Sequence, residues 1–396
     1  MRTIGIGERR SRLARRHRLA PGHRAVDAVE AARSMVCLHG TDAATVYLSA
    51  WARVDGLTVA DLERALYVDR SLVKHLAMRR TLFVFPRETL SAAQAGASDH
   101  IADRERRTLI RDVAGAGLHA DGERWFSETC QQVLAALSDG REATASELRD
   151  EIPLLAGSIE YGAGKAWGGR AGVGPRVLNT MSAQGKVVRA SNDGTWSTSR
   201  PRWATARTWL GADIAPLQPA EGVLRLVEQW LRVFGPGTAA DIKWWLGSTL
   251  AAVRHALAEL DAVQVDLDGP TGYLLPDDLE PADPVEPWAA LLPPLDPTTM
   301  GWAMRDWYLG PHKGQLFDTS GNAGPTVWWD GRIVGGWSQR DSGEVVLQLL
   351  EDVGSEARQV LDQEVARLTE WFGGTRVLPR FPSPLWKSGL VTRSRA

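Results

Sequence analysis

Three short segments of the chain repeat one pattern: a threonine, an acidic residue three positions later, and then an aliphatic residue. They are TVADL (58–62), TASEL (144–148) and TAADI (238–242). In this arrangement the threonine hydroxyl accepts a hydrogen bond from the third helical N–H group, and the carboxylate reaches back toward the cap. Each segment therefore predicts the start of a helix. Because an amphipathic helical pattern precedes each segment and strand patterns follow, the chain is expected to repeat one structural unit.

The third copy shows the order of elements most clearly. Residues 221–236 predict a helix that ends at Gly235-Pro236, residues 239–247 a short helix that ends at a glycine, and residues 248–262 a third helix. Residues 263–275 contain two strand patterns around a glycine-containing turn, which predicts a β-hairpin. Three helices followed by a hairpin is the order of a winged helix.

The other two copies follow the same order with more interruptions. The second has a helix over 125–139 and a strong turn signal, Asn192-Asp193-Gly194, between two strand patterns. The first has helices over 25–36 and 43–54, and then residues 70–86, in which helical spacing passes into the strand TLFVF. We therefore predict an α+β fold with three tandem winged helices.

Charge is spread unevenly along the chain. The first 24 residues hold eight arginines against one glutamate, whereas residues 259–287 carry nine carboxylates and no lysine or arginine. The formal net charge of −2 excludes a polycation that binds nucleic acid indiscriminately, so any nucleic-acid surface has to be local. The arginine run is either a solvated helix face or a set of phosphate contacts.

In a helix-turn-helix unit the third helix and the wing face the duplex. The cations expected there to contact phosphates are Arg70, Lys74, Arg79, Arg80, Arg176, Lys186, Arg189 and Arg254, with Arg12, Arg15 and Arg16 from the arginine run. The glycine-rich stretch 157–174 is not a phosphate loop, because Ile159 and Ala166 stand where glycine and Ser/Thr are required. We interpret it as a loop whose Lys165, Trp167 and Arg170 are candidates for contacting a ligand or DNA. Winged helices also serve as protein-interaction modules.

Several classes of protein are excluded by residue types that are scarce or wrongly spaced. With only Cys37 and Cys130 the chain has no disulfide framework and no thiolate cluster, and its eight histidines show no zinc-site spacing. No segment reads as a secretory signal or a membrane span. We expect no metal, no cofactor and no membrane contact, and a cytoplasmic, nucleoid-associated monomer.

The C-terminal part has a different pattern. Residues 325–330, 332–340 and 344–353 predict three strands separated by Asp330-Gly331 and Asp341-Ser342-Gly343 turns. A helix over 356–374 follows. This part is therefore expected to be β-rich and closed by a helix.

Several motifs together resemble the AlkZ/YcaQ family of bacterial helix-turn-helix DNA glycosylases. They are RLARRHRLAP (12–21), CLHGTD (37–42), LAMRRTLFV (76–84), FGPGTAADIKWWLG (234–247) and a block from LLPPLD (291–296) to DGRIVGGW (330–337) that holds Asp296, Arg305 and Arg332. The resemblance covers nearly the whole chain. It implies a basic, C-shaped channel formed by three winged helices, with Arg305 and Arg332 as further DNA contacts. The corresponding domains are a basic helix with winged helix 1 (1–120), winged helix 2 (121–215), winged helix 3 (216–285) and a β-rich part (286–396).

Known members of that family excise alkylated bases, including N7-alkylguanines and interstrand crosslinks. Their catalytic motif is Gln-x-Gln or Gln-x-Asp in the turn after the first helix, where this chain has His39-Gly40-Thr41. An N7-alkylated guanine is already a cationic leaving group, so the remaining tasks are to position a water and to stabilise oxocarbenium charge. Neutral His39 is able to orient or deprotonate water, Thr41 to hold it, and Asp42 to supply negative charge.

The same residues have structural interpretations. Asp42 stands where the helix over 43–54 needs an N-cap, Gly40 where a turn needs positive φ, and His39 where it can bond a backbone carbonyl.

From the resemblance and this chemistry we predict a monofunctional DNA glycosylase that acts on alkylated or cross-linked purines in double-stranded DNA, with His39, Thr41 and Asp42 as catalytic candidates. The alternative is a non-catalytic winged-helix DNA-binding protein, a regulator or lesion sensor; a protein-interaction scaffold is the weaker third.

Overall fold

In the computed structural model, which describes residues 1–161 and 168–391, each of the three threonine segments begins a helix as predicted. The helices are α4 (Val59–Glu63), α8 (Ala145–Glu151) and α12 (Ala239–Leu246). In each one the threonine hydroxyl accepts from the N–H of the acidic residue, whose carboxylate accepts from the threonine N–H. Two of the N-terminal N–H groups are thus satisfied reciprocally, which stabilises the helix start.

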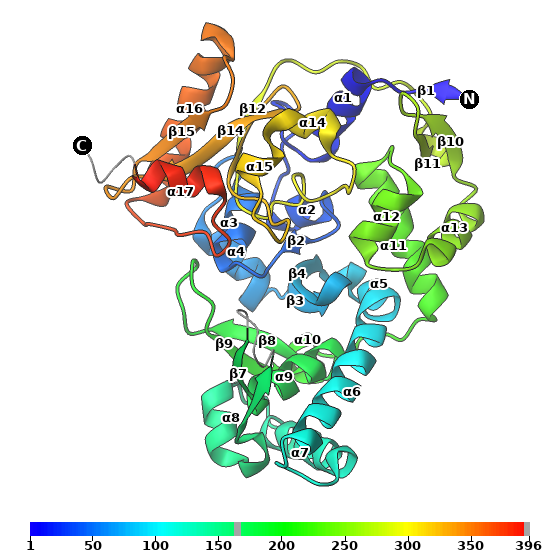
Figure 1. Ribbon diagram of the computed structural model, residues 1–396, viewed down its shortest axis with the longest axis vertical. Helices are drawn as coiled ribbons and strands as arrows, with labels where there is room; N and C mark the ends of the chain where they lie inside the picture. The colour runs from blue at the N-terminus through cyan, green and yellow to red at the C-terminus, as the bar shows by residue number, and fades with distance from the viewer. Residues whose placement is uncertain (162–167, 392–396) are drawn as a thin grey trace.

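The first unit joins short helices to a three-stranded sheet (Figure 1). Its helices are α2 (Ala28–Arg33), α3 (Ala43–Trp51) and α4, and its sheet has the order β2 (Leu38–His39), β4 (Thr81–Pro86), β3 (Leu72–Ala77). The helical spacing predicted over 70–80 is wrong, because residues 72–77 pair antiparallel with β4, with Val73 opposite Phe85. Arg79 and Arg80 form the turn between these strands, both with left-handed φ values, 55° and 60°.

The second unit lies below the first in Figure 1 and has its own hydrophobic core. Its helices are α6 (Asp99–Gly115), α7 (Gly122–Ala136), α8 and α9 (Val173–Ala183); its sheet is β5 (Ala143–Thr144), β9 (Pro201–Thr205), β8 (Val187–Asn192), and β6 (Ser158–Tyr161) pairs with β7 (Gly169–Gly172). The tight turn predicted at 192–194 is wrong. The partner strand begins only at Pro201, and the Asn192 side chain holds the longer loop by donating to the carbonyls of Thr195 and Thr198.

That loop reaches across to the rest of the molecule. Trp196 packs against Tyr47 of α3 with ring centroids 5.6 Å apart, and against Trp371 (5.2 Å) and Phe372 (6.2 Å) of α16 (Gly354–Phe372). The loop is therefore one of several links between the second unit and the first, beside the chain connection through α5 (Leu90–Ala93) and α6 and a hydrophobic cluster that joins Val73 to Val188 and Trp209.

The third unit matches its predicted order of elements. It contains α11 (Pro219–Phe234), α12, α13 (Leu250–Glu259) and the hairpin β10 (Val263–Asp266), β11 (Thr271–Leu274). Its third strand comes from the other end of the chain, since β1 (Arg2–Thr3) pairs parallel with β10. The short α10 (Ala206–Leu210) precedes this unit.

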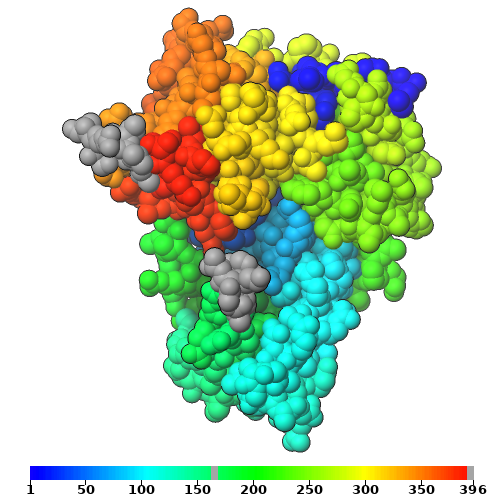
Figure 2. Space-filling view, viewed as in Figure 1, coloured from blue at the N-terminus to red at the C-terminus, as the bar shows by residue number. Residues whose placement is uncertain are grey.

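The C-terminal part is a four-stranded antiparallel sheet, which confirms the predicted meander and adds one strand to it. Its strands are β12 (Ala289–Leu292), β13 (Thr326–Trp329), β14 (Arg332–Gln339) and β15 (Val345–Leu349), and its helices are α14 (Asp306–Leu309), α15 (Lys313–Leu316), α16 (Gly354–Phe372) and α17 (Pro384–Val391). One hydrophobic core runs through this part, the first unit and the third unit. The second unit is thus a separate lobe, formed by the cyan and green segments at the bottom of Figure 2.

Among the described residues, no helix is both long and apolar enough for a membrane span, and no three His, Cys, Asp or Glu side chains cluster as metal ligands would.

Candidate active site and nucleic-acid interface

A cavity of about 730 Å³ lies where the CLHGTD turn of the first unit faces the second unit. The turn contributes Thr41, the β3–β4 turn contributes Arg80, and α6, α9 and β8 of the second unit form much of the remaining wall. Polar side chains on this cavity are Thr41, Arg80, Glu105, Asp112, Tyr161, Arg176, Asn179, Thr180, Arg189 and Arg380. The cavity therefore combines one residue of the predicted catalytic turn with a group of arginines.

Backbone pairing fixes the position of the turn. His39 pairs with Phe83 across β2 and β4, and the Gly40 N–H donates to the Leu82 carbonyl at 2.8 Å. Gly40 does not have the positive φ that we predicted for it. It is a glycine at a close approach of two backbones, because a Cβ atom there would lie 3.3 Å from the Leu82 carbonyl oxygen.

His39 is buried, with 8% of its surface exposed, and its ring meets the Phe83 ring edge-on at 5.4 Å. Burial, with the nearby positive charge of Arg79, lowers the pKa of His39 to about 3. Its Nδ1 atom accepts from the Thr41 N–H at 3.4 Å, so the ring proton is on Nε2. A base with so low a pKa takes a proton from water poorly, which argues against the predicted general-base role of His39. The ring instead holds the backbone of Thr41.

Asp42 is the N-cap of α3, as its structural interpretation predicts. One carboxylate oxygen accepts from the Ala44 N–H at 3.2 Å, and the other accepts from the backbone N–H of Arg380 at 3.1 Å. The side chain is buried, and that burial raises its pKa. The predicted catalytic role of Asp42 is therefore corrected: both oxygens serve the fold, and Asp42 does not line the cavity.

Thr41 is the one predicted catalytic residue that lines the cavity. It is partly exposed, and within the described residues its hydroxyl makes no hydrogen bond. Its carbonyl accepts from the Arg380 guanidinium at 3.1 Å. A hydroxyl of this kind is available to hold a water molecule or a substrate atom.

Three of the predicted DNA-binding cations converge on the same cavity. Arg80 is 61% exposed and pairs with Glu105 at 3.0 Å, and Arg176 pairs with Asp112 at 2.7 Å. Arg189 donates to Asn179 at 3.0 Å, and burial lowers its pKa to about 10. The cavity wall therefore carries positive charge that ion pairs with α6 partly balance.

The sequence analysis did not identify the two carboxylates of this wall as site residues. Glu105 and Asp112 stand seven residues apart on α6, which is two helical turns, so both lie on one face of the helix. The spacing predicts that both carboxylates lie on one face of the helix, but it does not predict which surface that face contacts. Asn179 and Arg380 were missed for the same reason, since their place on the cavity depends on contacts between distant segments.

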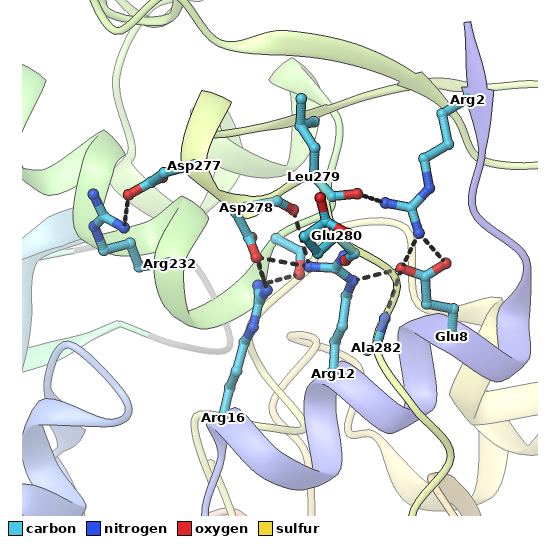
Figure 3. A network of polar contacts seen from close by, with 11 residues as sticks. Arg2, Glu8, Arg12, Arg16, Arg232, Asp277, Asp278, Leu279, Glu280 and Ala282 are labelled. Atoms are coloured by element: carbon cyan, nitrogen blue, oxygen red, sulfur yellow. Dashed lines mark hydrogen bonds and ion pairs between the residues drawn. The ribbon is translucent and has the colours of Figure 1, made fainter.

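Arg12 and Arg16 of α1 (Ile6–Arg16) are bound to the acidic segment instead of being free for DNA (Figure 3). Arg12 is only 3% exposed and pairs with Glu8 at 2.9 Å and with Asp278 at 2.8 Å. Arg16 binds both oxygens of the Asp278 carboxylate, and Arg15 donates to backbone carbonyls near residue 283. The prediction that this helix contacts phosphates is corrected for Arg12 and Arg16, because charges far apart in sequence neutralise each other.

Other predicted cations hold the fold together. Arg70 donates to the Trp209 carbonyl and covers its ring, and Lys74 donates to the Tyr67 hydroxyl at 2.6 Å. Burial lowers the pKa of Lys74 to about 8. We therefore no longer count Arg70 and Lys74 among the phosphate contacts.

Two cations near the third unit are also used by the fold: Arg79 lies over the Trp244 ring, and Arg305 is 8% exposed and donates to the Trp302 carbonyl. Arg332 is partly exposed and pairs with Glu351, and its contact with DNA stays a prediction. Of the remaining candidates, Arg170, Lys186 and Arg254 are exposed away from the cavity lining, and Lys165 and Trp167 lie outside the described residues.

Comparison with known proteins agrees with this architecture. Residues 32–371 match the DNA glycosylase AlkZ-like family. The interstrand DNA cross-link repair glycosylase of Streptomyces sahachiroi is 24% identical over 327 residues, which are 78% of this chain and 81% of that protein. The structure of the Streptomyces sahachiroi DNA glycosylase AlkZ superposes with a TM-score of 0.72 at 20% identity, over 94% of this chain and 98% of that one. Since the family match spans most of the sequence, this chain belongs to the AlkZ-like DNA glycosylase family.

Proposed function

We propose that this protein is a monofunctional DNA glycosylase that hydrolyses the N-glycosidic bond of alkylated or cross-linked purines in double-stranded DNA. The observation that carries the proposal is the cavity that Thr41 lines together with Arg80, Arg176 and Arg189. A polyanionic strand is drawn to such a wall, and the hydroxyl then lies beside the sugar of a bound nucleotide.

The chemistry proposed for the site differs from the one expected from the sequence. Thr41 holds the attacking water, and His39 keeps Thr41 in place through its Nδ1 atom. Glu105 and Asp112 are the carboxylates on the cavity, so they take the role first given to Asp42, the stabilisation of oxocarbenium charge. A cationic N7-alkylated base leaves without strong acid assistance, which suits a site whose one nearby histidine is neutral.

The proposal also covers the architecture. We propose that each helix-and-sheet unit is a winged helix and that the units enclose a DNA channel with the C-terminal part (286–396). The proposed ranges are 1–120, 121–215 and 216–285, except that α6 (Asp99–Gly115) packs in the core of the second unit and is assigned to it. The capped helix and three-stranded sheet found in every unit support this division. The protein is proposed to act as a monomer on the chromosome, in the nucleoid-associated fraction of the cytoplasm.

A duplex that contains one N7-methylguanine tests the proposal. The purified full-length chain is incubated with it, and free base is measured by chromatography against a sample without protein. We expect release by the wild type, a loss of at least tenfold in Thr41→Ala and substantial recovery in Thr41→Ser, which restores a hydroxyl. If no free base is released from this duplex or from a cross-linked one, although the protein binds both tightly, the enzymatic proposal is wrong.

Tight binding without base release would favour a DNA-binding protein without catalytic activity. One observation favours this second candidate: two of the three catalytic candidates, His39 and Asp42, are buried and used by the fold. Binding that hardly changes between low and high salt would contradict both candidates, because phosphate contacts release counterions.

A further inference from the structure

A strap from the far end of the chain crosses the CLHGTD turn. It consists of residues 373–383, between α16 and α17, and it lies beyond residues 32–371, which match the family. Arg380 is its point of attachment to the turn. The backbone N–H of Arg380 donates to the buried Asp42 carboxylate, and its Nη1 atom donates to the Thr41 carbonyl, both at 3.1 Å.

Arg380 is also one of the residues that line the cavity. The residue is exposed, lines the cavity beside Thr41, and places its charge close enough to Arg189 to lower the pKa of that residue. Within the described residues, Arg380 forms no ion pair with a carboxylate, whereas Arg80 and Arg176 on the same wall are each paired. Arg380 and Arg189, which have no carboxylate partner among the described residues, therefore line the cavity together with Thr41.

We propose that Arg380 is a phosphate-binding residue of the site, which clamps the DNA backbone next to the nucleotide that Thr41 faces. The inference rests on the proposed function for the identity of that nucleotide. An arginine fork suits a phosphate because it donates two parallel charge-assisted hydrogen bonds. The existing bond to the Thr41 carbonyl couples the clamp to the turn, so a bound phosphate and the Thr41 hydroxyl keep a fixed relation.

The chain offers a matched control four residues earlier in the same strap. Arg376 carries the same charge, but it pairs with Asp341 at 2.8 Å and does not line the cavity. Arg380→Ala and Arg376→Ala change the net charge equally, so general electrostatic attraction to DNA falls equally in both. Because the backbone N–H that holds Asp42 remains in Arg380→Ala, we expect the variant to fold, and its thermal unfolding verifies this.

The experiment measures the affinity of the full chain for an undamaged duplex and for one with N7-methylguanine, from about 50 to 200 mM salt. We expect Arg380→Ala to weaken binding about tenfold and to reduce the slope of log affinity against log salt by about one, the loss of one phosphate contact. Arg376→Ala is expected to leave the slope unchanged. Arg380→Lys keeps the charge and is expected to restore the slope, whereas Arg380→Gln is not.

Equal slopes for Arg380→Ala and Arg376→Ala would overturn the inference, whatever happens to base release. The two proposals fail separately. A wild type that releases no base, with a reduced slope in Arg380→Ala, refutes the glycosylase and leaves the phosphate clamp standing. A wild type that releases base, with an unchanged slope in Arg380→Ala, supports the glycosylase and refutes the phosphate clamp.

Discussion

Arg53 and Asp296 form an ion pair with no exposed surface on either side chain, with the closest nitrogen and oxygen 2.8 Å apart. Asp296 belongs to the LLPPLD motif, and it also accepts from the Ser49 hydroxyl and the Thr298 N–H. The pair therefore joins α3 of the first unit to the C-terminal part at the centre of their shared core. Every lone pair that a solvated carboxylate would offer to water is used here by the protein.

Removing one partner leaves the other charge buried and unpaired. We expect Asp296→Ala to lower the free energy of unfolding by about 3–5 kcal/mol. The double variant Arg53→Met, Asp296→Leu removes both charges and is expected to recover a large part of that loss. Chemical denaturation of the three proteins measures it; a single variant as stable as the wild type would contradict the structural role given to the pair.

The two carboxylates of the cavity wall give a prediction in which binding and catalysis move in opposite directions. Glu105→Gln and Asp112→Asn each remove negative charge beside an arginine that we propose to contact DNA, so both variants are expected to bind duplex DNA a few times more tightly. If either carboxylate stabilises the oxocarbenium charge, its variant releases base about tenfold more slowly at saturating DNA. Single-turnover release and binding titrations are measured on the same preparations.

Unchanged release rates in both variants would limit Glu105 and Asp112 to holding Arg80 and Arg176. The variant Glu123→Gln serves as a control, since that carboxylate is exposed and pairs with Arg106 away from the cavity. It is expected to change neither quantity.

Buried histidines set the response of stability to acid. Burial lowers the pKa of His75 to about 4, and its Nε2 atom is 2.9 Å from the Ser98 hydroxyl. In the unfolded chain a histidine titrates near 6.5, so below that pH the unfolded state binds protons that the folded state does not. Stability is therefore expected to fall as the pH drops from about 6.5 toward 4, by up to about 1.4 kcal/mol per pH unit for each such histidine.

Urea unfolding of His75→Gln at several pH values tests this sign and size. Between pH 6 and 5 the variant is expected to lose stability less steeply than the wild type, by about 1.4 kcal/mol per pH unit. His255→Gln is the matched control, because His255 is 73% exposed on α13. A steeper dependence in His75→Gln than in the wild type would contradict the assignment of a neutral buried ring.

The loop that carries Trp196 is expected to hold the second unit against the first. Trp196→Ala removes an aromatic ring that lies between α3 and α16, and we expect a loss of about 2 kcal/mol, less than for a fully buried tryptophan. Cleavage by a protease within residues 193–200 is expected to accelerate. Trp196→Phe keeps an aromatic contact and is expected to behave much like the wild type; equal loss in both variants would contradict a packing role for the ring.

Features that depend on neighbouring residues were predictable from the sequence. The three capped helices, the hairpin of residues 263–274 and the C-terminal meander each rest on contacts within a few positions, and all are present. The strand at 72–77 was mistaken for a helix because its conformation is set by pairing with β4, which residue spacing does not reveal. The same limit applies to the loop at 193–200.

The candidate site was predictable in place but not in detail. The turn at 37–42 does reach the cavity, yet only Thr41 faces it, because the Phe83 ring covers His39 and the Arg380 backbone engages Asp42. The partner of Asp42 is 338 positions away. Likewise Asp278, which binds Arg12, is 266 positions away, so the sequence did not reveal that Arg12 and Arg16 form ion pairs with the acidic segment.

The parallel pairing of Arg2–Thr3 with Val265–Asp266 gives the chain a closed-ring connectivity. The strand β1 completes the sheet of the third unit, and the strap of residues 373–383 binds the CLHGTD turn of the first unit. A fragment cut at any unit boundary thus lacks an edge strand or the strap of residues 373–383. During synthesis, β1 cannot pair until residues 265 and 266 of β10 have been translated. The third unit can therefore complete its sheet only late in synthesis.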